Sequence, residues 1–133
     1  MKTLTLKKLT IVSIFVLFAG IYAKAQPNLP YYVHNGLGCS IVVDWKVLKP
    51  IPSCGTVCDS GSMTIPMGST IPIYATSCSS ACNIYITVTK VGLTTLITPV
   101  SVDDNNPNNS GAPGCNGTGS FNMDWYPDNV DIN

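Results

Sequence analysis

Six cysteines constrain the fold of this chain more than any other feature of its sequence. They are Cys39, Cys54, Cys58, Cys78, Cys82 and Cys115. The middle four form two C-x-x-x-C pairs, and four thiolates at such a spacing are one way to hold a zinc ion. Redox motifs also use paired cysteines, but usually with the shorter C-x-x-C spacing. An even number of cysteines in an exported chain favours structural disulfides instead.

The start of the chain predicts export. Lys2, Lys7 and Lys8 precede an apolar run, residues 9–23, which is short for a membrane span and of the length of a signal-peptide core. The small residues that follow predict cleavage of a signal peptide comprising residues 1–25, in a style typical of bacteria. An uncleaved anchor is the alternative. We therefore expect a secreted, periplasmic or cell-surface protein, with no transmembrane segment after cleavage.

The pairing of the cysteines is not determined by their spacing, because six cysteines allow 15 connectivities. We expect Cys54–Cys58 and Cys78–Cys82 as two local bridges, with Cys39–Cys115 closing a long loop. A crossed pairing between the two C-x-x-x-C motifs is the main alternative. The long bridge would contribute most to stability, because the entropic effect of a crosslink grows with the length of the loop that it closes.

Alternating apolar and polar residues predict an all-β fold. The period of two is clearest over residues 39–47, 83–91 and 120–126, and weaker strands are expected over 31–35, 62–66, 70–75 and 93–98. Pro72 cannot donate to a ladder, so its strand is expected at a sheet edge. The prediction is a single domain, residues 26–133, forming a small disulfide-stabilised antiparallel β-sandwich of about seven strands. Its expected core residues are Ile41, Val43, Trp45, Ile84, Ile86, Val88, Phe121, Met123 and Trp125.

Residues 103–119 contain no large apolar side chain and predict a long flexible loop. Within it, Asp104, Asn106 and Asn108 alternate as the oxygen ligands of a calcium loop do. The match is incomplete, because the loop lacks the glycine and the bidentate glutamate of that motif. A turn-rich loop without metal is the alternative, since these residue types are common in turns. Apart from possible calcium, no cofactor is expected.

The sequence offers little for catalysis. His34 is its only histidine, it has no arginine or glutamate, and no G-x-S-x-G nucleophile motif is present. We therefore expect a protein that is not an enzyme. Outward-facing tyrosines are better candidates for function, because exposed aromatic rings stack on sugars and anchor protein contacts. Tyr74, Tyr85 and Tyr126 are the candidate ligand-binding residues, and cross-strand packing is the alternative role.

The net charge of the expected mature chain limits the classes of partner that it can bind. Three lysines and seven aspartates remain after residue 25, a formal charge of −4. A nucleic-acid partner is not expected, because such binding requires a basic surface. We expect a protein or a glycan as the partner. The predicted function is an exported non-catalytic binding or structural module, and the alternatives are a carbohydrate-binding module, with or without calcium, and a small secreted effector such as a toxin, an inhibitor or a membrane-active protein.

Overall fold

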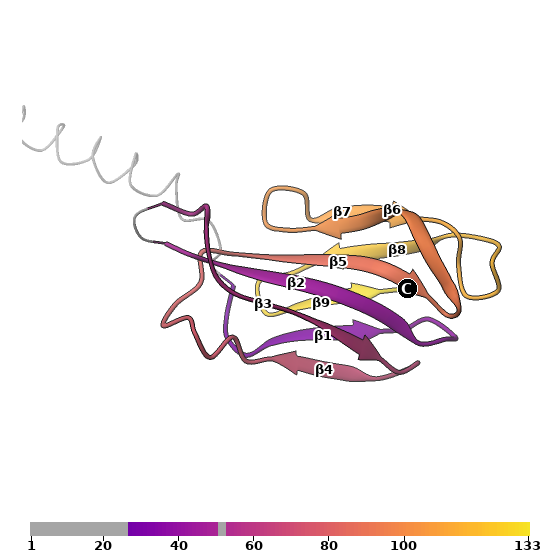
Figure 1. Ribbon diagram of the computed structural model, residues 1–133, viewed down its shortest axis with the longest axis horizontal. Helices are drawn as coiled ribbons and strands as arrows, with labels where there is room; N and C mark the ends of the chain where they lie inside the picture. Colours follow the sequence, from indigo (N-terminus) through magenta and orange to yellow (C-terminus); the bar gives the residue numbers. More distant parts are fainter. Residues whose placement is uncertain (1–26, 51–52) are drawn as a thin grey trace, which may run out of the picture.

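A computed structural model describes residues 27–50 and 53–133, and the predicted signal peptide lies outside these residues. The described chain folds into two packed β-sheets joined by disulfides, which confirms the expected all-β sandwich (Figure 1). Within the described residues the sandwich has nine strands, two more than expected. They are β1 (Tyr31–Asn35), β2 (Ile41–Lys49), β3 (Thr56–Ile65), β4 (Thr70–Ile73), β5 (Asn83–Val91), β6 (Thr94–Val102), β7 (Asn108–Gly111), β8 (Phe121–Trp125) and β9 (Asn129–Ile132).

The two sheets differ in their pairing. Sheet A has the strand order β4-β1-β9-β8-β7, and sheet B has the order β3-β2-β5-β6. Neighbouring strands are antiparallel except β1 and β9, which run parallel in the middle of sheet A. Along one rim, β6 and β7 lie side by side, and the side-chain amide of Asn109 donates to the Ser101 carbonyl at 2.9 Å (Figure 1). Strands β3 and β4 form the opposite rim, as expected for the strand that contains Pro72.

Alternation along the strands builds the core between the sheets. Eight of the nine residues expected there are buried, and Trp45 is the exception. Its indole packs against the core but is only half-buried, because it extends across Gly61 on the edge strand β3. A Cβ atom at Gly61 would lie 2.8 Å from Cζ2 of Trp45, so this glycine makes room for the ring. No helix in the described part of the chain is long and apolar enough to cross a membrane.

Two strands were missed by the sequence prediction. The expected flexible loop over residues 103–119 is wrong at Asn108–Gly111, because these residues form β7 and pair antiparallel with β8. Gly111 allows this pairing, since a Cβ atom there would lie 2.5 Å from the ring of Phe121. Strand β9 lies in the acidic C-terminal segment, and its Val130 and Ile132 are fully buried. The fold therefore contains strands whose sequences carry few or no apolar residues.

A fully buried asparagine ties the two sheets together at one end. The amide nitrogen of Asn35, at the end of β1, donates to the carbonyls of Ile65 and Pro66 at 3.1 Å and of Cys39 at 2.9 Å. Its side-chain oxygen accepts from the backbone N–H of Leu37 at 3.0 Å. Buried polar groups are retained when they are bonded in this way. Asn35 therefore links β1 of sheet A to the end of β3 in sheet B.

Candidate functional site

The outer face of sheet A carries a polar row that crosses all five of its strands. Each member lies opposite the next in the strand register, and the row consists of Thr70, His34, Asp131, Asp124 and Asn108. Side chains directly opposite one another on a sheet are close enough to interact. The row is joined by hydrogen bonds at both ends: His34 Nδ1 and the Thr70 hydroxyl are 2.9 Å apart. With its amide nitrogen facing Asp124, Asn108 donates to that carboxylate at 2.9 Å.

A second row on the same face contains aromatic side chains. Tyr32 lies opposite Pro72 on β4 and opposite Asn129 on β9. The backbone N–H of Tyr126 donates to the Asn129 carbonyl at 2.7 Å, which places Tyr126 across the β8–β9 turn from that asparagine. Tyr32 is 42% exposed and Tyr126 is 46% exposed. Two half-exposed rings therefore lie in the row next to the polar row.

A shallow depression lies over β7 and β8. It has a volume of about 440 Å³ and is lined by Asn108, Asn109, Ser110, Asn122 and Asp124. The lining thus offers amide donors and acceptors, a hydroxyl and one carboxylate, without a cation. Such a set suits hydrogen bonding to several hydroxyl groups of one ligand. The depression is wide open to solvent, so it fits a ligand that lies along the sheet.

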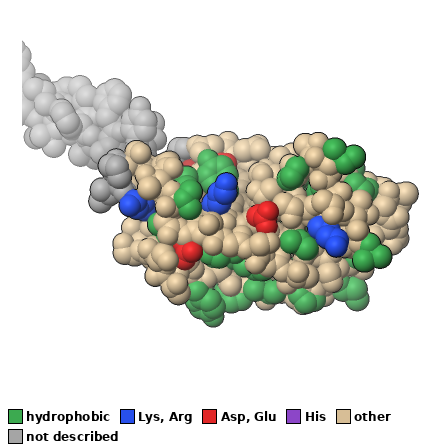
Figure 2. Space-filling view, in the orientation of Figure 1, with side chains coloured by type: hydrophobic (Ala, Val, Ile, Leu, Met, Phe, Trp, Pro, Cys, Tyr) green, Lys and Arg blue, Asp and Glu red, His purple; other side chains and the backbone are tan. Residues whose placement is uncertain are grey.

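The two faces of the sandwich carry different charges. Sheet B contains three lysines, which lie in β2 and β5: Lys46, Lys49 and Lys90. Figure 2 shows lysine side chains, so the face visible there is the face of sheet B. The outer row of sheet A contains Asp124 and Asp131, and its strands contain no lysine. A surface of one sign repels ligands of the same sign. The face of sheet A therefore disfavours polyanions.

The three predicted ligand-binding tyrosines do not form one row. Tyr126 lies on the second row of sheet A, while Tyr74 follows the end of β4 and is 66% exposed. Tyr85 lies on β5 of sheet B opposite Lys46. Burial raises the pKa of the Tyr85 hydroxyl, and the adjacent Asp103 raises it further. Tyr32, which lies across β9 from Tyr126 in the same row, is the aromatic residue that the candidate set omitted.

The predicted calcium ligands lie on different elements. Asn108 belongs to β7 and faces Asp124, whereas Asp104 and Asn106 belong to the turn before it. That turn is organised by Asp103, whose carboxylate accepts from the backbone N–H groups of the two residues that follow Asp104. Among the described residues, no group of three or more His, Cys, Asp or Glu side chains could hold a metal. Calcium binding by Asp104, Asn106 and Asn108 stays a prediction.

His34 lies on the outer face of sheet A. It is half-buried, bonded to Thr70 and opposite Asp131. Nδ1 of His34 is engaged with the Thr70 hydroxyl, so one ring nitrogen is left for Asp131 or a bound ligand, and the tautomer decides whether that nitrogen donates or accepts. Its place in the polar row, between Thr70 and Asp131, makes it part of the same surface as Asp124 and Asn108.

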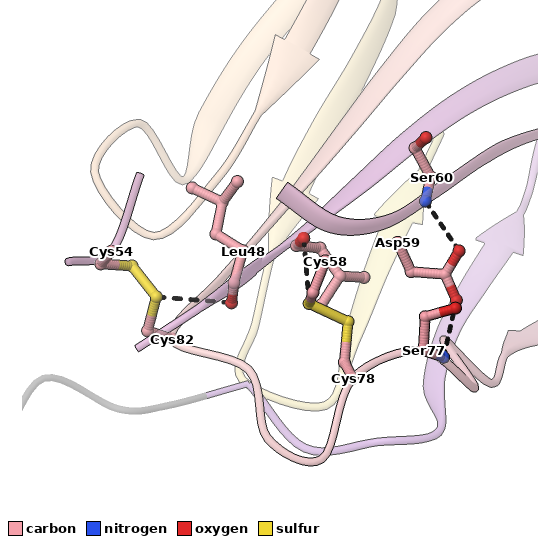
Figure 3. The surroundings of a disulfide bond; sticks show 9 residues. Leu48, Cys54, Cys58, Asp59, Ser60, Ser77, Cys78 and Cys82 are labelled. Carbon is pink, nitrogen blue, oxygen red and sulfur yellow. Dashed lines mark hydrogen bonds between the residues drawn. A yellow bond between two sulfur atoms is a disulfide. The ribbon is translucent and has the colours of Figure 1, made fainter. Parts of the chain in front are cut away.

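The disulfides lie near both ends of β2, Cys39–Cys115 before its start and the other two beside Val47 and Leu48. Cys39–Cys115 forms as predicted, but the two local bridges are wrong: Cys54 pairs with Cys82, and Cys58 pairs with Cys78 (Figure 3). Cys54 lies in the turn that precedes β3, Cys58 lies within β3, and each is bonded to a cysteine of the segment between β4 and β5. The crossed alternative forms instead, with Cα–Cα distances of 5.8 and 5.5 Å.

The crossed pair forms a small ladder. The two bridges join the start of β3 to the segment that leads from β4 into β5, so they connect the rims of sheets B and A. Their sulfur atoms lie beside β2, with Cys58 Sγ 3.3 Å from the Val47 carbonyl and Cys82 Sγ 3.4 Å from the Leu48 carbonyl. Every cysteine of the chain is paired. Three structural disulfides indicate that the protein folds in an oxidising environment outside the cytosol.

Two polar residues of sheet A, Asn122 and Asn129, were not among the candidates drawn from the sequence. They carried only weak signals, because they stand in short strands rich in turn-forming residues. The alternation of Val130 and Ile132 with Asn129 and Asp131 was the signal that would have revealed β9. No protein-family model, curated protein or solved structure matches this chain, so its function is argued from the site itself.

Proposed function

We propose that this protein is an exported, non-catalytic binding module, secreted or held in the periplasm or at the cell surface, whose ligand is a neutral carbohydrate. The observation that carries the proposal is the outer face of sheet A, where the half-exposed rings of Tyr32 and Tyr126 border a row of amides, carboxylates and one imidazole. Sugars present hydroxyl groups at their edges and apolar C–H faces, and they match a surface that alternates polar groups with aromatic rings.

The negative charge of this face limits the classes of ligand that can bind there. Asp124 and Asp131 lie directly opposite each other, and no lysine lies in the strands of sheet A to balance them. Phosphorylated, sulfated or nucleic-acid ligands would bring further negative charge to this face. Neutral chains of hexose or pentose units would add no negative charge to this face. The open depression over β7 and β8 also favours a chain bound along its length.

Binding of the mature, disulfide-intact protein to an array of neutral and acidic glycans tests the proposal, followed by calorimetry on the best ligand. Replacing Tyr126 by alanine removes a ring contact worth about 0.5–1.5 kcal/mol, so binding should weaken roughly two- to tenfold. Tyr32→Ala should act similarly. Ile97→Ala is the control, because Ile97 is fully exposed on sheet B.

Three results would contradict the proposal. They are a folded protein that binds no glycan, a preference for acidic glycans, and unchanged affinity in the Tyr32→Ala/Tyr126→Ala double variant. Repeating the titration with calcium and with a chelator shows whether the Asp104, Asn106 and Asn108 prediction bears on the same ligand. A chelator-sensitive affinity would support calcium-assisted binding.

A further inference from the structure

Each sandwich of this kind has four edge strands, and here three of them are protected. Strands β4 and β7 have four residues each, and β4 contains Pro72. On β6, residues 96–99 bulge out of the ladder opposite Thr89, and Pro99 lies in the bulge. Short strands, proline and bulges are the usual means of preventing edge-to-edge pairing. Strand β3, with ten residues, is the longest edge.

Only the first half of β3 is covered. Cys58 is bridged to Cys78, and the Asp59 carboxylate accepts from the backbone N–H groups of Ser60 at 2.9 Å and Ser77 at 3.2 Å (Figure 3). The second half, residues 61–65, has β2 as its only neighbouring strand in the described chain. Met67 in the turn after β3 is 63% exposed, and hydrophobic side chains gather along the lower rim in Figure 2, where β4 is the outermost strand.

The backbone of this uncovered half is directed outward at alternate residues. The carbonyl of Ser40 accepts from Gly92 N–H and that of Val42 from the Thr89 hydroxyl, so even-numbered residues at this end of β2 face β5. Odd-numbered residues of β2 therefore face β3, and their partners there are Met63 and Gly61. In an antiparallel strand the bonding direction alternates from residue to residue. The N–H and C=O groups of Ser62 and Thr64 consequently point away from the sheet.

We propose that two copies of this chain pair through these edges, with β3 of one copy antiparallel to β3 of the other. Residues 60–65 contain no charged side chain, so self-pairing brings no like charges together. Ser60, Ser62 and Thr64 occupy one face of the strand, and hydroxyl pairs across an antiparallel junction are favourable. Pairing about a twofold axis near Ser62 or Met63 satisfies the same groups on both copies.

The dimer goes beyond the proposed function and does not depend on it. It joins the two B sheets into one continuous eight-stranded sheet, four strands from each copy. The twofold axis of such a junction is perpendicular to the sheet, so both A sheets lie on the same side of it. Their outer faces then point in the same direction, which suits two-site attachment to a single polymer or surface.

The test is the oligomeric state of the mature, disulfide-intact protein by sedimentation equilibrium between about 1 μM and about 1 mM. The wild-type protein should dimerise. Ser62→Lys places two ammonium groups near the twofold axis and should weaken association roughly tenfold or more. Thr98→Lys adds the same charge to the bulge of β6 and should leave association unchanged.

Amide hydrogen exchange on the wild-type protein gives a second measurement that needs no variant. Protection of the Ser62 and Thr64 amides should rise with protein concentration, while protection of the amides of residues 96–98 should not change with concentration. The proposal is overturned by a protein that stays monomeric throughout the range, by a Ser62→Lys variant that associates like the wild type, or by concentration-dependent protection confined to β4 or β7.

Discussion

Removing the Cys54–Cys82 bridge tests the crossed disulfide ladder most directly. The paired variant Cys54→Ser/Cys82→Ser opens a loop with a sequence separation of 28. Because the Cys58–Cys78 bridge lies inside this loop and stays closed, about ten residues are released, and the loop-entropy relation gives a loss of about 2.7 kcal/mol of stability. A domain of this size has a free energy of unfolding of about 5–15 kcal/mol. The variant should therefore still fold, with a urea midpoint lowered by about 2 M.

The matched control is Cys54→Ser/Cys58→Ser, which removes one cysteine from each bridge. It should expose two free thiols, on Cys78 and Cys82, and lose the stabilisation of both bridges. The paired variant should contain no free thiol. Thiol titration in denaturant and urea unfolding measure the two quantities. If Cys54→Ser/Cys58→Ser instead had no free thiols and unfolded at a higher urea concentration than the paired variant, the crossed ladder would be refuted.

Three further substitutions test the fold. Gly111→Ala should cost about 1–3 kcal/mol of unfolding free energy, because its Cβ atom would meet the Phe121 ring, whereas Gly38→Ala points into open space and should cost about 0.5 kcal/mol or less by urea unfolding. Tyr31→Phe should cost about 1–3 kcal/mol at neutral pH, since it removes the hydroxyl that lies 2.9 Å from the Tyr126 carbonyl and 2.7 Å from the Asn129 carbonyl. Burial raises the pKa of Tyr31, so the stabilisation by its hydroxyl is complete below pH 10.0, the pKa of the unfolded state, and declines above that pH. The difference in unfolding free energy between wild type and Tyr31→Phe should therefore shrink in unfolding curves measured above pH 10. Asp131→Asn removes the repulsion from Asp124 and should add about 0.2–1 kcal/mol at low ionic strength, with a gain in melting temperature that salt diminishes.

The period of two was sufficient to predict most of the core. Residues 39–47, 83–91 and 120–126 lie largely in strands β2, β5 and β8, and their apolar positions face inward. Trp45 departs from this pattern because the residue opposite it on the edge strand is a glycine. A sequence pattern gives the face on which a side chain lies. It does not give the size of the neighbour that covers it.

The candidate site was harder to predict, because its strands are held by their neighbours and not by their own composition. Strand β7 has the sequence Asn-Asn-Ser-Gly, which in isolation favours a turn. It is a strand because β8 offers a ladder and because Gly111 lets the ring of Phe121 approach. The crossed disulfides have a similar origin, since they depend on where the start of β3 meets the segment between β4 and β5. Long-range pairing of this kind is absent from local sequence.

The parallel contact between β1 and β9 sets an order of events for assembly. Strand β9 occupies the centre of sheet A and joins an early segment of the described chain to one of its last. Contacts between such distant segments form slowly, because the intervening chain must first be brought together. A polypeptide emerging N-terminus first therefore holds β1 half-bonded until residues 129–132 arrive. During that interval the incomplete sheet is most open to capture by a neighbouring molecule, so the yield of native protein should depend on how crowded its site of release is.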